Sequence, residues 1–164
     1  MKTYQGKYKV KHRSKYRGDP DNIIYRSMWE RHCFKWCDNN PSIKTWASEE
    51  VVVPYFYEVD KKYHRYFVDL TIRTNTGRTL LVEIKPSSQT QPPKRKKLNE
   101  ALTYMKNTSK WKYAQKFCDD RGYEFQIWTE KELEAMGIKT MTMRFKASKT
   151  KTGKRIWKSL KKRV

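Results

Sequence analysis

Two acidic residues and a lysine interrupt two apolar runs in the middle of the chain. Asp69 lies within residues 66–72, and Glu83 and Lys85 lie within residues 80–86. A carboxylate is costly to bury without a partner, and the two-residue period of a strand places Lys85 on the same face as Glu83. Two carboxylates and an amine on one sheet face suit a divalent-metal site for phosphodiester chemistry.

The spacing of these residues predicts a β-hairpin that sets Asp69 opposite Glu83. Both are equally distant along the chain from Thr76, the middle residue of a polar turn. Directly opposed residues on antiparallel strands have Cβ atoms about 5 Å apart. Like charges so close repel unless a cation or a proton lies between them, so the pairing predicts a metal. The alternative is a salt-bridge network on a solvated sheet face, against which the apolar Phe67 and Leu81 on that face argue.

The pattern around the hairpin predicts a single α/β domain over residues 19–143. A first helix is expected to begin near residues 19–21, which supply an acidic N-cap, and to end at residues 39–41. The resulting order, α-β-β-β-α-β with a terminal helix, indicates a mixed sheet. The other expected elements are strands over residues 43–46, 50–56, 64–73, 79–85 and 123–128, a helix over 97–120 and a short capped helix from Thr129.

Glu30 lies on the face of the first helix that is expected to contact the sheet. An unpaired acid is disfavoured there, and a third carboxylate reaching the metal site would explain it. The alternative is a glutamate at the rim of the helix, paired with Arg26 or Lys35.

The net charge of +21 is concentrated at the two ends of the chain. Residues 1–17 contain seven lysines and arginines and residues 144–164 contain ten, with no acid in either segment. We expect flexible basic arms over residues 1–18 and 144–164 that bind the phosphate backbone of DNA with weak sequence preference. Binding to an acidic membrane, or a simple gain in solubility, would also fit such tails. A further basic run at residues 92–97 is either a phosphate-binding loop or a solvated charged segment.

Three cysteines cannot form a disulfide framework, and their odd number suits a reducing compartment. His32, Cys33, Cys37 and His64 could be imagined as a zinc site, but a second cysteine pair is missing and buried cysteines are common. The chain has neither a run of about 20 apolar residues nor a signal-peptide segment, so it is expected in the cytosol.

An acid on the first helix, an aspartate on one strand and Glu-x-Lys on the next resemble the PD-(D/E)xK nuclease superfamily. The matching residues are Glu30, Asp69 and the run Glu83-Ile84-Lys85. Val68 stands where the motif has proline, and the carboxylate that binds metal is kept. The strings at residues 64–69, 81–86 and 126–130 are similar to the amino-terminal nuclease domains of transposon-excision endonucleases and to the head-completion nucleases of T-even-like tailed phages.

This resemblance implies a restriction-endonuclease-like core and Mg²⁺-dependent hydrolysis of DNA, with Mn²⁺ as a substitute. Asp69, Glu83 and the carbonyl oxygen of Ile84 would hold the metal, and Lys85 would orient the nucleophile. Glu30 would bind a second metal or its water shell. Glu49 or Glu50 could take this role if the helix assignment is wrong.

The phage resemblance further implies an endonuclease that processes packaged DNA before the head joins the tail, and it leaves exonuclease activity open. Its partners would be DNA and phage head, portal or neck proteins, in the host cytoplasm and in the virion. The alternatives are another nuclease of the superfamily, such as a transposase subunit or a repair or restriction enzyme, and a non-catalytic module that binds DNA or the virion.

Overall fold

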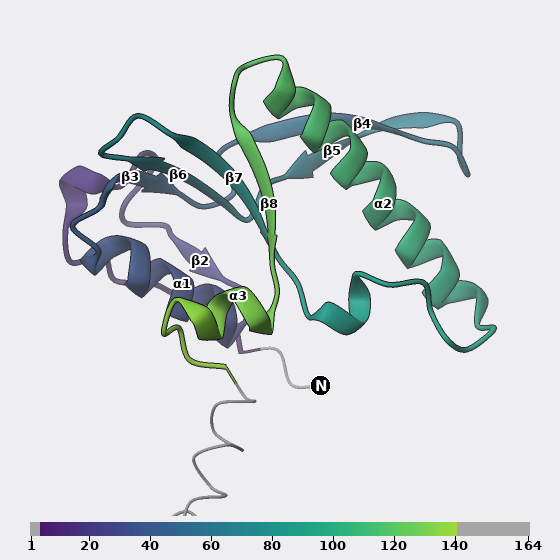
Figure 1. The fold of residues 1–164 in the computed structure, drawn as a ribbon, viewed down its shortest axis with the longest axis horizontal. Helices are drawn as coiled ribbons and strands as arrows, with labels where there is room; N and C mark the ends of the chain where they lie inside the picture. The colour runs from purple at the N-terminus through teal and green to yellow at the C-terminus, as the bar shows by residue number, and fades with distance from the viewer. Residues whose placement is uncertain (1–3, 141–164) are drawn as a thin grey trace, which may run out of the picture.

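A four-stranded mixed sheet forms the centre of the molecule and carries helices on both faces (Figure 1). The computed structural model describes residues 4–140. The sheet contains β3 (Ile43–Ala47), β6 (Leu70–Thr74), β7 (Thr79–Ile84) and β8 (Glu124–Trp128), and the helices are α1 (Met28–Asn39), α2 (Leu98–Asp119) and α3 (Glu130–Ala135). Two short ribbons, β1 (Gly6–Lys7) with β2 (Ile24–Tyr25) and β4 (Val52–Tyr57) with β5 (Lys62–Phe67), and two 3-10 turns, Arg13–Lys15 and Ser87–Gln89, complete the described elements.

The strand order β3-β6-β7-β8 combines two kinds of pairing. β6 pairs antiparallel with β3 and with β7, whereas β8 runs parallel to β7. A parallel pair requires a long crossover, which α2 supplies between β7 and β8. The sheet is therefore mixed, as the sequence predicts.

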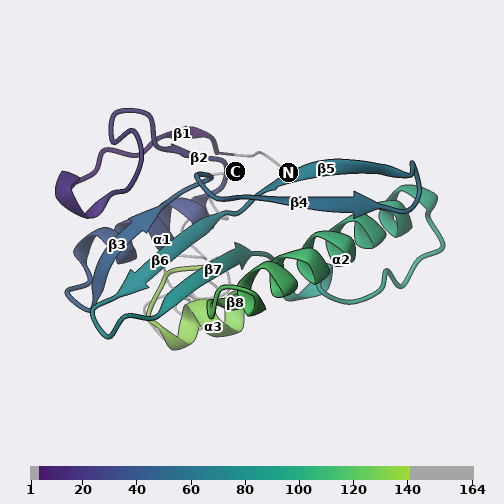
Figure 2. The same ribbon diagram turned by 90° about the horizontal axis from the view of Figure 1, so that it is seen from above.

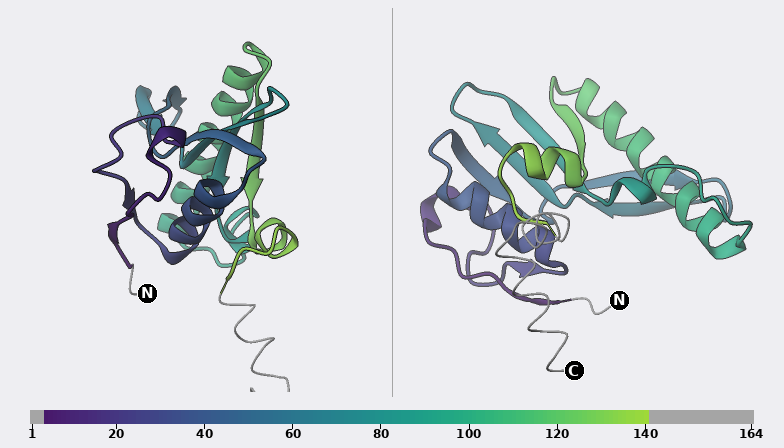
Figure 3. Two further views of the ribbon diagram at one scale, coloured as in Figure 1. Left: turned by 90° about the vertical axis from the view of Figure 1, so that its left-hand side faces the viewer. Right: turned by 60° about the horizontal axis from the view of Figure 1, so that its bottom comes forward.

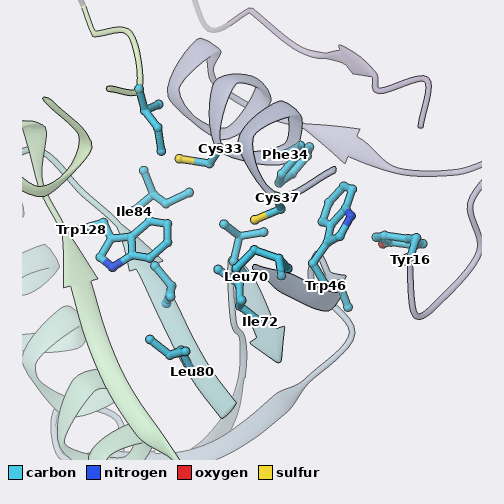
Figure 4. Packing of buried hydrophobic residues seen from close by; sticks show 14 of the residues in the cluster. Tyr16, Cys33, Phe34, Cys37, Trp46, Leu70, Ile72, Leu80, Ile84 and Trp128 are labelled. Atoms are coloured by element: carbon cyan, nitrogen blue, oxygen red, sulfur yellow. The ribbon is translucent and has the colours of Figure 1, made fainter. Parts of the chain in front are cut away.

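Both faces of β7 are covered, which explains why this strand is apolar almost throughout. On one face, Leu80, Val82 and Ile84 pack with Leu70 and Ile72 against Phe34 and the two cysteines of α1 (Figure 4). On the other face, Leu81 packs against α2 and against the β4–β5 ribbon. Figure 2 shows this ribbon extending beyond the sheet alongside α2. All six residues of β7 are buried, including Glu83.

The expected strand over residues 64–73 is wrong as a single element, because the chain changes sheets at Val68 and Asp69. β5 ends at Phe67 and pairs with β4, whereas β6 begins at Leu70 and joins the central sheet. The Val68 N–H donates to the Val51 carbonyl, and the Val68 carbonyl accepts from the Glu49 N–H, at 3.0 and 3.1 Å. Asp69 therefore stands at a break between two sheets.

The first helix begins later than expected. Ser27 caps α1 by accepting the Glu30 N–H on its hydroxyl at 3.2 Å, whereas residues 19–21 belong to a turn before β2. An acidic cluster before an apolar residue suits an Asx turn as well as a helix cap, and here the turn forms. The helix ends at Asn39, as predicted.

The other predicted elements are observed within one or two residues of their expected bounds. α2 is continuous, and after it Gly122 adopts φ +69° while the Tyr123 N–H donates to the Cys118 carbonyl at 2.9 Å. α3 begins with a capping box formed by Thr129 and Glu132. These boundaries follow local rules and so could be predicted from the sequence.

The expected flexible arm over residues 1–18 is wrong for residues 4–18, which pack against α1 and β3. Figure 3 shows the N-terminal segment running beside α1. Val10 and Tyr16 are buried, and the Tyr16 ring meets Trp46 edge-on with centroids 4.8 Å apart (Figure 4). The Lys15 ammonium donates to three carbonyls at the end of α1, those of Cys37, Asp38 and Asn40, at 2.8–3.1 Å. The basic C-terminal segment 144–164 lies outside the described residues.

The imagined zinc site does not form among residues 4–140, where no group of three or more His, Cys, Asp or Glu side chains is arranged to hold a metal ion. Cys33 and Cys37 lie in the core, where burial raises the pKa of both thiols. His64 stacks on Tyr55 and lies 2.6 Å from the Asp60 carboxylate. In the same stretch of chain, no helix is long and apolar enough to cross a membrane.

The ordered N-terminal segment depends on Asp38, a fully buried carboxylate near the end of α1. Asp38 accepts hydrogen bonds from the Tyr8 hydroxyl and from the N–H groups of Lys11 and His12, at 2.7–2.9 Å. Asp38→Ala leaves these donors unpaired, so we expect a loss of about 2–4 kcal/mol in the free energy of unfolding, measured in urea. Amide exchange at Lys11 and His12 should accelerate in the same variant.

Asp21→Ala is the matched control, because it removes an exposed ion pair with Arg13 from the same segment. Such pairs contribute about 0–1 kcal/mol. Equal stability losses in the two variants would contradict the anchoring role of Asp38.

Candidate active site

Asp69 and Glu83, called the acidic pair below, meet at the end of the β6–β7 hairpin. The register pairs Leu70 with Val82, so the next position brings Asp69 opposite Glu83. One carboxylate oxygen of Asp69, Oδ2, accepts the N–H of Ile84 at 2.8 Å. The predicted hairpin register is therefore confirmed, although Asp69 precedes β6 rather than lying within a longer strand.

The electrostatics of Asp69 are unfavourable when it is charged. Burial raises the pKa of Asp69 well above its usual range, and the neighbouring charges of Glu83 and Glu30 raise it further. The Ile84 N–H and the Lys85 ammonium oppose this shift. A proton or a cation next to Asp69 relieves the repulsion.

Glu83 is 5% exposed and is held by two groups from different elements. The Tyr66 hydroxyl donates a hydrogen bond to Oε2 of Glu83, and the Lys85 ammonium lies 3.5 Å from Oε1. Burial and the charge of Glu83 raise the pKa of Tyr66, so its hydroxyl stays protonated and remains a donor. These contacts fix the orientation of the Glu83 carboxylate.

Tyr66 is a site residue that the sequence analysis missed. In a continuous strand, Tyr66 and Asp69 would lie on opposite faces, because their positions differ by three, an odd number. The break at Val68 and Asp69 removes this restriction and turns both side chains toward Glu83. The available signal was the string at residues 64–69, which includes Tyr66 and resembles the nuclease domains but assigns no role to the tyrosine.

Lys110 of α2 was also missed, because its position in the sequence is that of an ordinary helical lysine. Its ammonium lies 5.5 Å from the centroid of the Tyr66 ring. Burial lowers the pKa of Lys110, and the nearby charge of Glu83 opposes this effect. Lys110 therefore belongs to the surroundings of the acidic pair.

Glu30 and Glu49 lie at the rim of the site and are joined by Arg26. The Arg26 N–H donates to Oε2 of Glu30 at 2.9 Å, and its guanidinium pairs with both oxygens of Glu49 at 2.9 and 3.3 Å. Burial raises the pKa of Glu30, and the charge of Glu49 adds to this effect. The carboxylate of Glu50 lies apart from them, beside Gly18. Glu30 thus contacts the backbone of Arg26, whereas the guanidinium that was expected to pair with Glu30 in the alternative pairs with Glu49.

The donors at the acidic pair are oxygen atoms, the ligands that Mg²⁺ prefers. They are the two carboxylates and the carbonyl oxygen of Ile84, the residue between Glu83 and Lys85. Within residues 4–140, Oδ1 of Asp69 makes no hydrogen bond and so has a free lone pair. Magnesium commonly binds through one or two carboxylates and retains several waters, so this set fits Mg²⁺ without a third acidic ligand.

Comparison with known proteins agrees with the predicted nuclease resemblance. Residues 40–130 match the family model described as the TnsA-like endonuclease N terminal. The chain is also 44% identical over 147 residues to the head completion nuclease of Enterobacteria phage T4, and the alignment covers 84% of this chain and 98% of that protein. The family match includes Asp69, Glu83 and Lys85 but begins after Glu30.

The raised pKa of Asp69 predicts how the metal-free protein responds to pH. The native state holds a proton on Asp69 up to its raised pKa, whereas the unfolded chain loses this proton near pH 4. The free energy of unfolding therefore falls as the pH rises from about 4 toward the pKa of Asp69 in the folded protein. Asp69→Asn removes the charge and keeps an acceptor for the Ile84 N–H. In EDTA at pH 7 we expect this variant to melt about 3–8 °C higher than the wild type, with the difference vanishing near pH 4.

The matched control is Asp120→Asn, which removes an exposed carboxylate at the end of α2. It should leave the melting temperature nearly unchanged at both pH values. A lower melting temperature for Asp69→Asn at pH 7 would show that the charge of Asp69 is not a burden in the folded protein.

Proposed function

Because the chain belongs to the family of TnsA-like endonuclease N-terminal domains and is a nuclease, we propose that it hydrolyses DNA with Mg²⁺ held at the acidic pair. The observation that carries the proposal is the cross-strand approach of Asp69 and Glu83, with the Lys85 ammonium 3.5 Å from Glu83. Two like charges in a largely buried position repel each other, and a divalent cation bound between them removes this repulsion, which favours metal binding.

Each group around the acidic pair has a role in this chemistry. Asp69, Glu83 and the Ile84 carbonyl would hold the ion, which when bound polarises a phosphoryl oxygen and lowers the pKa of a water ligand. Tyr66 keeps Glu83 in one orientation, and the Ile84 N–H does the same for Asp69. Lys85 offsets the negative charge that develops on the phosphate and orients the attacking water.

We assign Glu30 to the water shell of this ion or to a second ion. The pKa of Glu30 is raised by burial, and Glu30 in turn raises that of Asp69, so the two carboxylates share one electrostatic environment. Arg26 holds Glu30 and Glu49 together and positions both at the rim. Glu49 is the better second choice, since Glu50 lies beside Gly18.

A hollow that begins just after the hairpin and includes basic side chains offers a path for DNA phosphates. It has a volume of about 1100 Å³ and lies between residues 87–95, α2 and α3. Lys94, Arg95 and Lys131 line it, and its loop starts two residues after Lys85. The basic run at residues 92–97 is therefore assigned to phosphate binding, together with the C-terminal basic segment.

The biological role is proposed from the phage T4 relative, of which nearly the full length is covered. We propose that the protein acts as an endonuclease in phage head completion and processes packaged DNA before the head joins the tail. Its protein partners would then be head, portal or neck components, in the host cytoplasm and in the virion. A circular substrate tests the endonuclease mode, and a linear end-labelled substrate tests exonuclease activity.

The catalytic assignment predicts which side chains DNA cutting requires. With supercoiled plasmid and Mg²⁺, wild-type protein should produce nicked and linear DNA. Glu83→Gln and Lys85→Ala should cut about 10³-fold more slowly or worse, because they remove a metal ligand and the cation facing the phosphate. DNA binding in EDTA should be largely retained, since the basic segments are unchanged.

Glu124→Gln is the matched carboxylate control, because Glu124 lies on the adjacent strand β8 in an exposed pair with Arg78. It should cut like the wild type. Intact plasmid with wild-type protein and Mg²⁺ would refute the proposed function, as would equal cutting by Glu83→Gln.

Tyr66→Phe tests the orientation of Glu83 without changing the ligands. The substitution removes one hydroxyl, and losing a group that orients a metal ligand typically lowers metal affinity about 10–100-fold. Calorimetric titration with Mg²⁺ should show this loss for Tyr66→Phe. Tyr63→Phe, on the exposed face of the same strand, should bind Mg²⁺ like the wild type; equal affinities for the two variants would exclude the orienting role.

A further inference from the structure

Two lysines from different elements flank Glu83. Lys85 follows it on the chain and lies 3.5 Å from Oε1. Lys110 comes from the middle of α2, is partly buried, and lies over the ring of Tyr66, whose hydroxyl donates to Oε2 of Glu83. Glu83 and Asp69 both act on Lys110 electrostatically. The Lys110 ammonium is therefore placed beside the tyrosine that holds Glu83.

A second lysine of α2 shows what is special about Lys110. Lys106, one helical turn earlier, lies 5.6 Å from the centroid of the Tyr57 ring, an arrangement almost identical to that of Lys110 over Tyr66. The Tyr57 hydroxyl, however, donates to the carbonyl of Leu102 rather than to a carboxylate. Lys106 therefore packs on the ribbon in the same way without facing the acidic pair.

A divalent cation changes the electrostatics of the acidic pair. Without metal, the carboxylates of Glu83 and Asp69 attract the ammonium groups of Lys85 and Lys110. A divalent cation bound to these carboxylates adds two positive charges, which reduces this attraction for both lysines. The centre then attracts an anion, and a DNA phosphate is the anion that a nuclease binds.

We propose that Lys110 is a second phosphate-binding lysine of the active site, which contacts the DNA phosphate at the acidic pair when a divalent cation is bound. This inference rests on the proposed function and extends it, because it adds a contact from α2 to the motif residues of the hairpin. Without metal, the charge of Lys110 is directed to Glu83 and Asp69, so its contribution to DNA binding depends on the metal.

Metal titration separates this role from a purely structural one. The probe is Ca²⁺, which takes the same oxygen ligands, titrated calorimetrically without DNA into the full chain. Lys110→Met removes a positive charge that repels the ion, so we expect Ca²⁺ to bind about tenfold more tightly. Lys106→Met, the matched control, should bind Ca²⁺ like the wild type. If Lys110 only held the site together, its removal would weaken Ca²⁺ binding.

DNA binding supplies the second measurement. A labelled phosphorothioate duplex, chosen to resist cutting, is titrated in EDTA and in Ca²⁺. Lys110→Met should match the wild type in EDTA and bind about tenfold more weakly in Ca²⁺, whereas Lys110→Arg should recover most of the affinity. For Lys106→Met, the ratio of its DNA affinity to that of the wild type should be the same in EDTA and in Ca²⁺.

Support for the proposal requires tighter Ca²⁺ binding together with weaker DNA binding in Ca²⁺. Unchanged or weaker Ca²⁺ affinity in Lys110→Met, or wild-type DNA affinity in Ca²⁺, would overturn it. These outcomes are distinct from a failure of the proposed function, because intact plasmid with wild-type protein refutes the nuclease activity while both titrations still decide the role of Lys110.

Discussion

The repulsion between Asp69 and Glu83 is the constraint on which the rest of the site depends. The hairpin places two carboxylates side by side in a largely buried position, where neither charge is well solvated. The surrounding groups each reduce this cost: the Ile84 N–H and the Tyr66 hydroxyl donate hydrogen bonds, and the Lys85 ammonium contributes positive charge. Such an arrangement gives little stability by itself and strong attraction for a cation.

The break between β5 and β6 makes this convergence possible. Because the chain leaves the β4–β5 ribbon at Phe67 and enters the central sheet at Leu70, Asp69 lies where the ribbon, the sheet and the start of α1 come together. Tyr66 reaches Glu83 from the ribbon, and Glu30 approaches the rim from α1. A straight strand through residues 64–73 would have kept these groups apart.

The N-terminal segment shows that a basic composition does not identify a free arm. Lys15 binds the last carbonyls of α1, and Arg13 pairs with Asp21, so part of the positive charge serves the fold. The segment is ordered because Tyr8, Val10 and Tyr16 contact α1 and β3, and because Asp38 accepts its N–H groups. The burial of these side chains and the hydrogen bonds to Asp38 together outweigh the polar, basic character of the segment.

The sequence by itself determined the features that follow from local geometry. A short turn centred on Thr76 fixes the antiparallel register, which sets Asp69 against Glu83, and the strand period adds Lys85. Gly122 similarly fixed the end of α2, and the capping box fixed the start of α3. The tertiary structure alone decided the break at Asp69, the packing of residues 4–18, the pairing of Arg26 with Glu49, and the approach of Tyr66 and Lys110 to Glu83. These contacts join elements distant in the chain, so their energies come from packing and burial in three dimensions, which no local pattern of residues records.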